Sequence, residues 1–279
     1  MTFAERLLAP ALLLPSLLLT GCMSLDSFFF NGKAVTAYAL SSDVIPAEAF
    51  EEVSFPTADD LTLYGVWAHQ PVADAPVLLY FHGNADNIDA YMGQLGDYWS
   101  FGYEVFIFDY RGYGKSEGSP SYAGVLTDGF AAVDYVEDAT GLETADIPFL
   151  GLSLGGSVAT RVAGTDAPKV LITEDMFANG QKLMNDGSGL DLPDGWLLVD
   201  EWDNAAAAAE VTSPFLVIHG DSDTYIQPES AAEIFDAVTV DPKRLWLVPG
   251  AGHAEAAATE PELYRDNVMC WIGQTCAAE

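Results

Sequence analysis

Short apolar runs alternate with helix-like stretches from about residue 51 to the C-terminus, and this alternation limits the folds open to the chain. Runs such as 77–81 and 105–108 have no polar face, as is typical of strands buried on both sides of a sheet. Strands that alternate with helices predict an α/β fold with a mainly parallel central sheet and helices on both faces. The apolar runs lie at 77–81, 105–108, 149–152, 170–173, 215–218 and 245–248, and residues 62–68 alternate as a strand does. The helix-like stretches lie at 87–100, 121–139, 154–165, 227–238 and 260–272.

Length and charge restrict the function classes. Half of the 279 residues are hydrophobic, which supplies the core of one α/β domain. Lys and Arg number 10 against 42 Asp and Glu, so the net charge of −32 repels nucleic acid and anionic membrane surfaces. The acids are scattered singly, which indicates a solvated surface. Adaptation to a salt-rich habitat and simple solubility both fit this charge.

The N-terminus carries an export pattern. Residues 7–19 are apolar except for Ser16, a stretch too short to span a bilayer but typical of the hydrophobic part of a signal peptide. The tetrapeptide L-T-G-C at 19–22 follows directly and resembles the bacterial lipobox, which implies a lipid anchor on Cys22 and an exported, membrane-anchored protein on the periplasmic or cell-surface side. Ordinary cleaved secretion and an uncleaved anchor are the alternatives. The expected segments are a signal peptide at 1–21, a tether and lead-in at 22–50 whose Phe28, Phe29 and Phe30 pack on the domain, and the α/β domain at 51–276.

The other two cysteines, Cys270 and Cys276, lie near the C-terminus. An exported protein meets oxidising conditions, so these thiols either form a small disulfide or remain free. No group of Cys and His has the spacing of a metal site, and the chain has only four histidines. We therefore expect no bound metal.

The pentapeptide G-L-S-L-G at 151–155 is the strongest local indication of chemistry. It follows apolar residues of a predicted strand and precedes G-S-V-A, which can begin a helix. A nucleophile elbow requires this context, because so sharp a turn leaves no room for Cβ atoms at the glycines. Ser153 would then lie at a helix N-terminus, where free N–H groups favour developing negative charge. A glycine-rich turn without chemistry is the alternative.

A serine hydroxyl is a weak nucleophile near neutral pH and needs a general base. His253 has the best setting of the four histidines, because it lies in the loop P-G-A-G-H directly after a predicted strand. His69, His82 and His219 lie at strand ends, where structural hydrogen bonds account for them. We therefore predict His253 as the base.

The base in turn needs an orienting acid, which is expected after the preceding strand. The loop H-G-D-S-D after the run at 215–218 offers two candidates, Asp221 and Asp223. Each of the three groups then follows its own strand, at the same edge of a parallel sheet. The residues therefore predict a triad of Ser153, His253 and one of these aspartates.

Two backbone N–H donors are needed to stabilise a tetrahedral intermediate. The N–H of Leu154, directly after the nucleophile, is one candidate. The other is the N–H of Asn84 in the loop H-G-N-A, unless that loop is only a structural turn. A further loop, D-Y-R-G-Y-G-K-S, contains Arg111, for which we expect an ion pair with a carboxylate such as Asp109; a direct contact with substrate is the alternative.

These motifs together resemble the α/β-hydrolase superfamily over nearly all of residues 51–272. The stretches Y-F-H-G-N-A, D-Y-R-G-Y-G-K-S and G-L-S-L-G-G look most like a subgroup of small, lid-poor serine hydrolases, which includes thioesterase-like members acting at membranes. The resemblance implies the chain order Ser, Asp, His, and its loop pattern H-G-x-x-D favours Asp223 over Asp221. It also implies hydrolysis of a small-molecule or lipid ester or thioester through an acyl-enzyme on Ser153, with no cofactor.

Substrate and activity have alternatives. Residues 175–204 form the only sizeable insertion before the acid, a small cap whose Trp196, Leu197 and Leu198 either line an acyl pocket or pack on the domain. The same triad would serve a peptidase on this fold. A non-catalytic lipoprotein that binds at the cell surface is the other alternative. The pattern indicates no oligomeric state.

Overall fold

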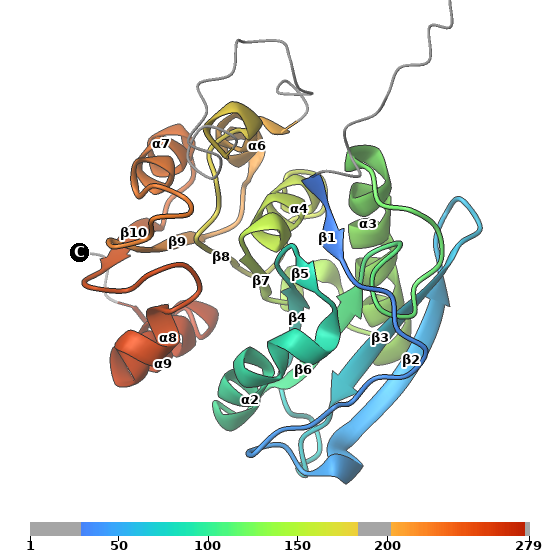
Figure 1. The fold of residues 1–279 in the computed structure, drawn as a ribbon. Coiled ribbons are helices and arrows are strands. Elements are labelled where there is room, and N and C mark those ends of the chain that lie inside the picture. Colours follow the sequence, from blue (N-terminus) through green and yellow to red (C-terminus); the bar gives the residue numbers. More distant parts are fainter. Residues whose placement is uncertain (1–28, 184–201, 277–279) are drawn as a thin grey trace, which may run out of the picture.

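The computed structural model describes residues 29–183 and 202–276, and Figure 1 shows their fold. At its centre is an eight-stranded sheet of order β10-β9-β8-β7-β4-β6-β3-β2. The pairs β2–β3 and β3–β6 are antiparallel and the others are parallel, so the predicted mainly parallel sheet is confirmed. The strands are β2 Phe50–Pro56, β3 Thr62–Ala68, β4 Val77–Phe81, β6 Glu104–Asp109, β7 Phe149–Leu152, β8 Leu171–Glu174, β9 Phe215–Gly220 and β10 Lys243–Val248.

Helices cover both faces of the sheet (Figure 1). Helices α3, α4, α6 and α7 bury side chains in one hydrophobic cluster, and α2, α8 and α9 in a second cluster on the other face. In β4, Leu79 and Phe81 belong to the first cluster and Leu78 and Tyr80 to the second, because successive side chains of a strand alternate. Burial on both faces explains the unbroken apolar run. The helices are α2 Met92–Ser100, α3 Tyr122–Thr140, α4 Leu154–Ala163, α6 Asn204–Glu210, α7 Glu229–Ala237, α8 Ala256–Thr259 and α9 Pro261–Ile272, with short 3-10 helices η1 Ala47–Ala49, η2 Ile88–Tyr91 and η3 Thr144–Asp146.

The predicted elements are confirmed with small changes at their ends. The helix predicted at 121–139 is α3, which begins after Ser121, whose hydroxyl accepts a hydrogen bond from Gly124 N at 3.1 Å. It ends at Gly141, a left-handed residue with φ of 72°. Strand β2 is missing from the predicted set because its sequence, F-E-E-V-S-F-P, has two glutamates and no apolar run. It forms an edge of the sheet, where charged residues and proline are tolerated.

The residues before β2 that the structure describes lie against the domain. Strand β1 Asn31–Gly32 pairs in parallel with β5 Ala85–Asp86, directly after the loop that contains Asn84. Tyr38 Oη donates a hydrogen bond to Asp109 Oδ2 at 2.6 Å. The lead-in therefore contacts loops at the carboxyl ends of β4 and β6.

An aromatic cluster joins this lead-in to the residues before α6. The Phe29 ring stacks on Trp202 with centroids 4.9 Å apart, and Phe30 lies 6.2 Å from the same indole. Phe177 completes the cluster at 5.9 Å from Trp202. Phe29 and Phe30 thus pack on the domain as predicted. The predicted residues Cys22, Phe28, Trp196, Leu197 and Leu198 lie outside the described residues.

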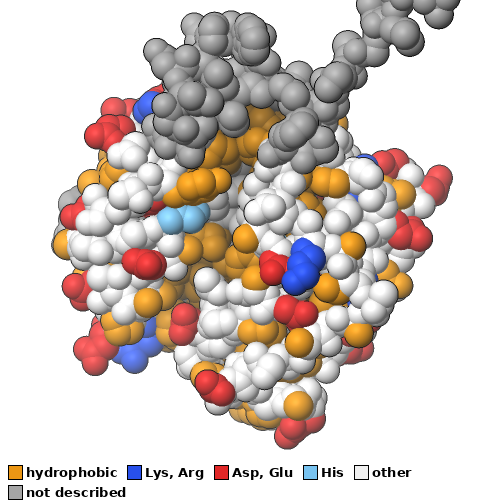
Figure 2. All heavy atoms as spheres, viewed as in Figure 1, with side chains coloured by type: hydrophobic (Ala, Val, Ile, Leu, Met, Phe, Trp, Pro, Cys, Tyr) orange, Lys and Arg blue, Asp and Glu red, His pale blue; other side chains and the backbone are white. Residues whose placement is uncertain are grey.

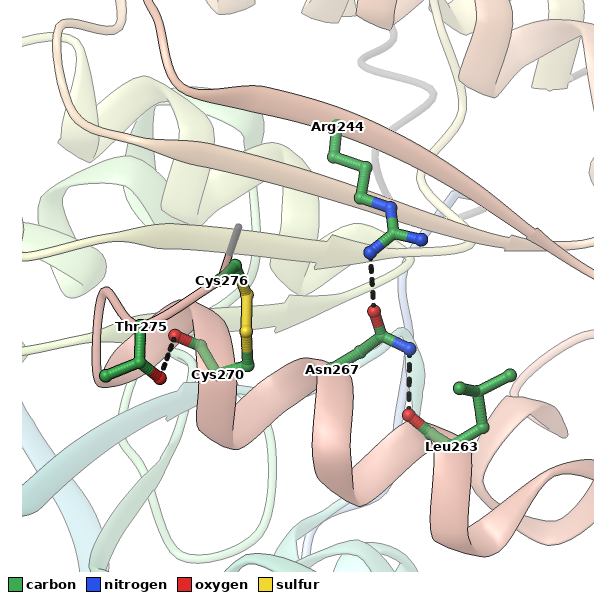
Figure 3. Close-up of a disulfide and its surroundings, with 6 residues drawn as sticks. All are labelled: Arg244, Leu263, Asn267, Cys270, Thr275 and Cys276. Atoms are coloured by element: carbon green, nitrogen blue, oxygen red, sulfur yellow. Dashed lines mark hydrogen bonds between the residues drawn. A yellow bond between two sulfur atoms is a disulfide. The ribbon is translucent and has the colours of Figure 1, made fainter. Parts of the chain in front are cut away.

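The C-terminal helix α9 is followed by a short turn that a disulfide closes (Figure 3). A disulfide joins Cys270, in α9, to Cys276. Of the two states that the sequence left open, free thiols or a disulfide, the structure has the disulfide. Asn267, one turn before Cys270, accepts a hydrogen bond from Arg244 of β10 at 3.0 Å, which holds the helix to the edge strand. In the part of the chain that the structure describes, no helix is long and apolar enough to cross a membrane.

Candidate active site

Ser153 lies at the sharp turn between β7 and α4. Its backbone has φ of 53° and ψ of −115°, a strained conformation for a residue other than glycine. The flanking glycines are required, since a Cβ on Gly151 would lie 2.6 Å from Gly155 O, and one on Gly155 would lie 2.5 Å from His82 O. Ser153 is 7% exposed at the N-terminus of α4, as the pentapeptide predicts.

Asp223 and His253 form a hydrogen-bonded pair between the loops that follow β9 and β10. His253 Nδ1 lies 2.7 Å from Asp223 Oδ2. The other carboxylate oxygen, Oδ1, accepts backbone hydrogen bonds from Tyr225 N at 2.8 Å and Ile226 N at 2.9 Å. Asp221 instead is exposed and accepts from Gly250 N at 2.7 Å. Of the two candidate acids, the structure therefore pairs Asp223 with the histidine.

Opposing effects set the charges of this pair. Burial would lower the pKa of His253, but the hydrogen bond and the charge of Asp223 outweigh it, and the carboxyls of Asp175 and Glu174 act in the same direction. The pKa of His253 is therefore raised above its usual value. Burial would also raise the pKa of Asp223, but the hydrogen bonds from His253 and from Ile226 N lower it below its usual value. Asp223 thus stabilises the imidazolium that His253 forms when it takes up a proton.

Two acids at the carboxyl end of β8, Glu174 and Asp175, are not among the predicted site residues. Glu174 is 5% exposed and Asp175 is fully buried. The Glu174 carbonyl oxygen accepts a hydrogen bond from Ser153 N at 2.8 Å, and Asp175 Oδ2 accepts one from Ala254 N at 2.6 Å. The sequence does carry a sign of them, since they follow the apolar run at 170–173 directly, as the other site residues follow theirs.

This dipeptide connects Ser153 to the loop of His253 at one edge of the sheet. Figure 2 shows a hollow on this side of the molecule, lined by hydrophobic side chains, with histidine atoms beside it. Within the described residues, no hydrogen bond joins Ser153 to His253. Catalytic hydrogen bonds are often long in unliganded enzymes and shorten when substrate binds.

The two predicted oxyanion donors lie just after neighbouring strands of the sheet, β7 and β4. Leu154 is the first residue of α4, and Asn84 lies in the loop after β4, which is next to β7 in the sheet. Among the residues that the structure describes, neither backbone N–H donates a hydrogen bond. The Asn84 side chain fixes its loop, because its Oδ1 accepts from Tyr113 Oη at 2.6 Å and its Nδ2 donates to Phe29 O at 2.6 Å.

The predicted pairing of Arg111 with Asp109 is wrong. Arg111 instead pairs with Asp128 of α3 at 2.8 Å and with Asp59 at 2.8 Å. The fully buried Asp128 also accepts a hydrogen bond from Arg111 N at 2.8 Å, so both the backbone and the side chain of Arg111 are held against α3. Asp109 accepts hydrogen bonds from Tyr38 and Ile88. Arg111 therefore holds its loop, as predicted, through different carboxylates.

The remaining histidines make structural contacts, as predicted. His82 Nδ1 lies 2.7 Å from Gly83 O, and His219 Nε2 lies 2.9 Å from Ile226 O. Within the described ranges, one group of side chains could hold a metal ion, formed by Asp175, His219 and Asp223 with ligand atoms inside 4.8 Å of one another. These two carboxylates already accept hydrogen bonds from Ala254 N and His253, so the group is occupied by contacts of the protein itself.

Comparison with known proteins identifies the family. A model of the alpha/beta hydrolase fold matches residues 76–171. An uncharacterized protein of Mycobacterium tuberculosis H37Rv is 32% identical over 235 residues, which are 82% of this chain and 79% of the relative. The chain belongs to the α/β-hydrolase family. The YfhR protein of Escherichia coli K12 is 29% identical to this hydrolase over 234 residues, 80% of each chain. The predicted α/β-hydrolase fold is confirmed, and the lid-poor subgroup stays a prediction.

Solved structures of esterases share the fold of this α/β-hydrolase. The esterase Pf2001 of Pyrococcus furiosus superimposes with a TM-score of 0.71 and 20% identity, covering 88% of this chain and 98% of that one. Acetyl xylan esterase 1 of Thermoanaerobacterium superimposes with a TM-score of 0.65 and 15% identity, covering 85% and 87%. At these identities the likeness shows the fold alone.

Proposed function

We propose that this α/β-hydrolase is a serine hydrolase that cleaves carboxylic ester or thioester bonds through an acyl-enzyme on Ser153. The observation that carries the proposal is the strained Ser153 turn at the N-terminus of α4, with the Asp223–His253 pair on neighbouring loops of the same sheet edge. A strained, nearly buried serine is retained where the strain serves the reaction. The pair supplies the base and its orienting acid.

The proposed reaction has two steps. His253 Nδ1 is engaged by Asp223, which leaves Nε2 to take the proton from Ser153 Oγ. The deprotonated oxygen attacks the substrate carbonyl carbon, and Nε2 then returns the proton to the leaving alcohol or thiol. In the second step His253 activates a water molecule that attacks the acyl-enzyme, and the acid leaves as Ser153 is reprotonated.

Charge develops on the former carbonyl oxygen during both steps. The N–H groups of Leu154 and Asn84 are assigned to stabilise it, since both lie beside the Ser153 turn and neither has another acceptor among the described residues. The raised pKa of His253 complements this, because the imidazolium that forms in each step is stabilised first by Asp223. Both charges of the transition state then have a partner.

Labelling with a fluorophosphonate probe tests the proposal directly. The protein is expected to be labelled and the Ser153→Ala variant is not, with its turnover reduced by about 10⁶-fold. Ser157→Ala is the matched control, because Ser157 lies in the same helix, fully buried, and accepts a hydrogen bond from Asn204. Unlabelled folded parent protein would support the non-catalytic binder, and turnover by Ser153→Ala would remove Ser153 from the reaction.

A panel of esters, thioesters and peptide amides defines the bond that is cleaved. Because the neighbours in the fold include esterases, we expect ester turnover above amide turnover. Activity on peptide amides without activity on esters would favour the peptidase. Chain-length series within the esters and thioesters then rank acyl preference by kcat/KM.

We also propose that Cys22 carries the lipid that holds the enzyme on the outer side of a membrane. The L-T-G-C sequence supports it, and the seven steps from Cys22 to Phe29 span at most about 25 Å. Phe29 itself packs on Trp202, so this tether would keep the domain close to the membrane. The expected result is partition of the full chain into a detergent phase and of Cys22→Ser into water. Equal partition of both would contradict the anchor.

A further inference from the structure

The acids Glu174 and Asp175 lie where three loops of the site meet. Glu174 is the last residue of β8, the strand between β7 and β9 in the sheet. Its carbonyl oxygen accepts from Ser153 N, and its carboxyl accepts from Tyr264 Oη at 2.8 Å. Tyr264 in turn is bonded to Tyr98 at 2.8 Å, so this end of β8 is tied to both α9 and α2. The bond from Ser153 N continues the β7–β8 ladder, whereas the tyrosine contacts lie outside the sheet.

Asp175 carries the contacts to the histidine loop. Its two carboxylate oxygens accept separate backbone hydrogen bonds, from Gly220 N at 2.9 Å and from Ala254 N at 2.6 Å. Gly220 ends β9, three residues before Asp223, and Ala254 directly follows His253. The Asp175 side chain therefore contacts both segments that carry the Asp223–His253 pair, the end of β9 and the loop after β10.

Both partners of this contact have unusual backbones. Asp175 has φ of 48° and Ala254 has φ of 59°, left-handed values that cost free energy in residues other than glycine. Such conformations persist where surrounding contacts determine them, and they gather at functional sites. The hydrogen bond between Asp175 and Ala254 N joins these two residues directly beside His253.

We propose that Asp175 is a positioning residue for the catalytic base: its carboxylate clamps the His253 loop to the strand end that holds the Ser153 turn, and it places a second negative charge near the imidazole. This inference rests on the proposed function of His253. It adds a role for a residue that touches neither the substrate nor the Asp223–His253 hydrogen bond.

The charged groups around His253 indicate which of the two acids, Glu174 or Asp175, supplies the second negative charge. Asp223 faces the ring from the loop after β9, Tyr225 packs against it at 5.1 Å, and Asp175 and Glu174 face it from β8. Burial, and then the charge of Asp175, raise the pKa of Glu174 to about 8, so Glu174 holds a proton near neutral pH. Burial also raises the pKa of Asp175, while the facing His219 and His253 and the N–H groups of Gly220 and Ala254 act in the opposite direction. Of the two acids, Asp175 is the one whose carboxylate oxygens bind the backbone beside both Asp223 and His253, so we assign the second charge to it.

The test compares Asp175→Asn with Asp221→Asn. The first removes a buried charge and leaves one amide oxygen for two backbone N–H donors, while the second removes an exposed charge and keeps an oxygen that accepts from Gly250 N of the same loop. The His253 ring signal is followed by NMR titration and assigned with a His253→Gln variant. The pH profile of kcat/KM on a chromogenic ester is measured beside it, since its acid limb reports the same group.

In Asp175→Asn, the His253 titration and the acid limb are expected to move together to lower pH, with kcat reduced roughly 10- to 100-fold by the misplaced base. Asp221→Asn moves neither midpoint. A residue with a purely structural role would reduce the folded fraction without shifting either midpoint, so an unmoved His253 titration in folded Asp175→Asn overturns the proposal. An equal shift in Asp221→Asn does so too.

Two additions keep these outcomes separate. If Asp175→Asn does not fold, Asp175→Ser replaces it, because a hydroxyl still accepts one of the two backbone hydrogen bonds without the charge. The NMR titration needs no turnover, so it reports on the clamp even if activity is absent. Turnover by Ser153→Ala would refute the proposed function alone, whereas a stationary His253 midpoint would refute the clamp alone.

Discussion

The most direct test of the turn geometry is Gly155→Ala. A Cβ at Gly155 would lie 2.5 Å from His82 O and closer still to the Phe81 carbonyl group. Ordinary contact between carbon and a neighbouring heavy atom is about 3.5 Å, so these groups must separate by about 1 to 1.5 Å. Both neighbours are backbone atoms at the end of β4, which cannot rotate away as a side chain would.

The displacement acts on the proposed oxyanion site. Separating α4 from the end of β4 moves Leu154 N away from Asn84 N, because His82 is two residues before Asn84. A misplacement of about 1 Å costs roughly 10²-fold in rate, and overpacking costs about 1–3 kcal/mol of stability. We expect kcat/KM on a chromogenic ester to fall by at least this factor, and the urea midpoint of unfolding to fall with it.

Gly164→Ala is the matched control at the other end of α4. Gly164 has an ordinary helical φ of −69°, and its added Cβ would lie 3.4 Å from Glu210 Cβ. This change is expected to leave turnover intact and to alter stability by no more than about 1 kcal/mol, since alanine restricts the unfolded chain. A folded Gly155→Ala protein with the turnover and stability of the parent would refute the close contact on which the argument depends.

Three further outcomes concern stability, each measured by unfolding in urea. Asp128→Ala is expected to cost about 3–5 kcal/mol because it removes the buried partner of a buried arginine and leaves it only the half-exposed Asp59. Asp59→Ala should cost no more than about 1 kcal/mol; equal losses would contradict this. Burial raises the pKa of Glu174 to about 8, so between about pH 5 and pH 8 the folded parent holds a proton that the unfolded chain releases, and its stability falls as pH rises through this range. The Glu174→Gln variant lacks this proton, so its stability should increase relative to that of the parent over the same range. A stability difference that does not change with pH would refute the assignment. Cys270→Ser should lose about 2 kcal/mol, the value for closing a short loop, and thiol alkylation of the parent should require prior reduction of the bond to Cys276.

Much of the fold was predictable because its strands are buried on both faces. The apolar runs at 77–81 and 149–152 coincide with β4 and β7, and the alternating stretch at 62–68 coincides with β3. Strand β2 was not predictable in this way, since an edge strand has one solvent-exposed side and needs no apolar run. The disulfide was left open because spacing alone does not bring two sulfur atoms together.

The partner of Arg111 shows the limit of local reasoning. Asp109 is near it in sequence, yet Asp128 of α3 pairs with it, because the helix packs so that a fully buried carboxylate meets the guanidinium. Asp175 was not singled out either, although it follows an apolar run as the predicted site residues do. Its contacts with Gly220 N and Ala254 N depend on β8 lying beside β9, which only the strand order establishes.

The sequence by itself determined the kind of fold and the residue types of the site. Apolar periodicity dictates a buried parallel sheet, glycine at 151 and 155 is demanded by a turn without room for Cβ atoms, and post-strand positions single out Ser153 and His253. Tertiary structure decided which of two aspartates meets the histidine, which carboxylates hold Arg111, and that β8 ends in a clamp. The physical reason is that periodicity and turns are local constraints, whereas hydrogen bonds and buried charges depend on neighbours that only packing brings within about 3 Å.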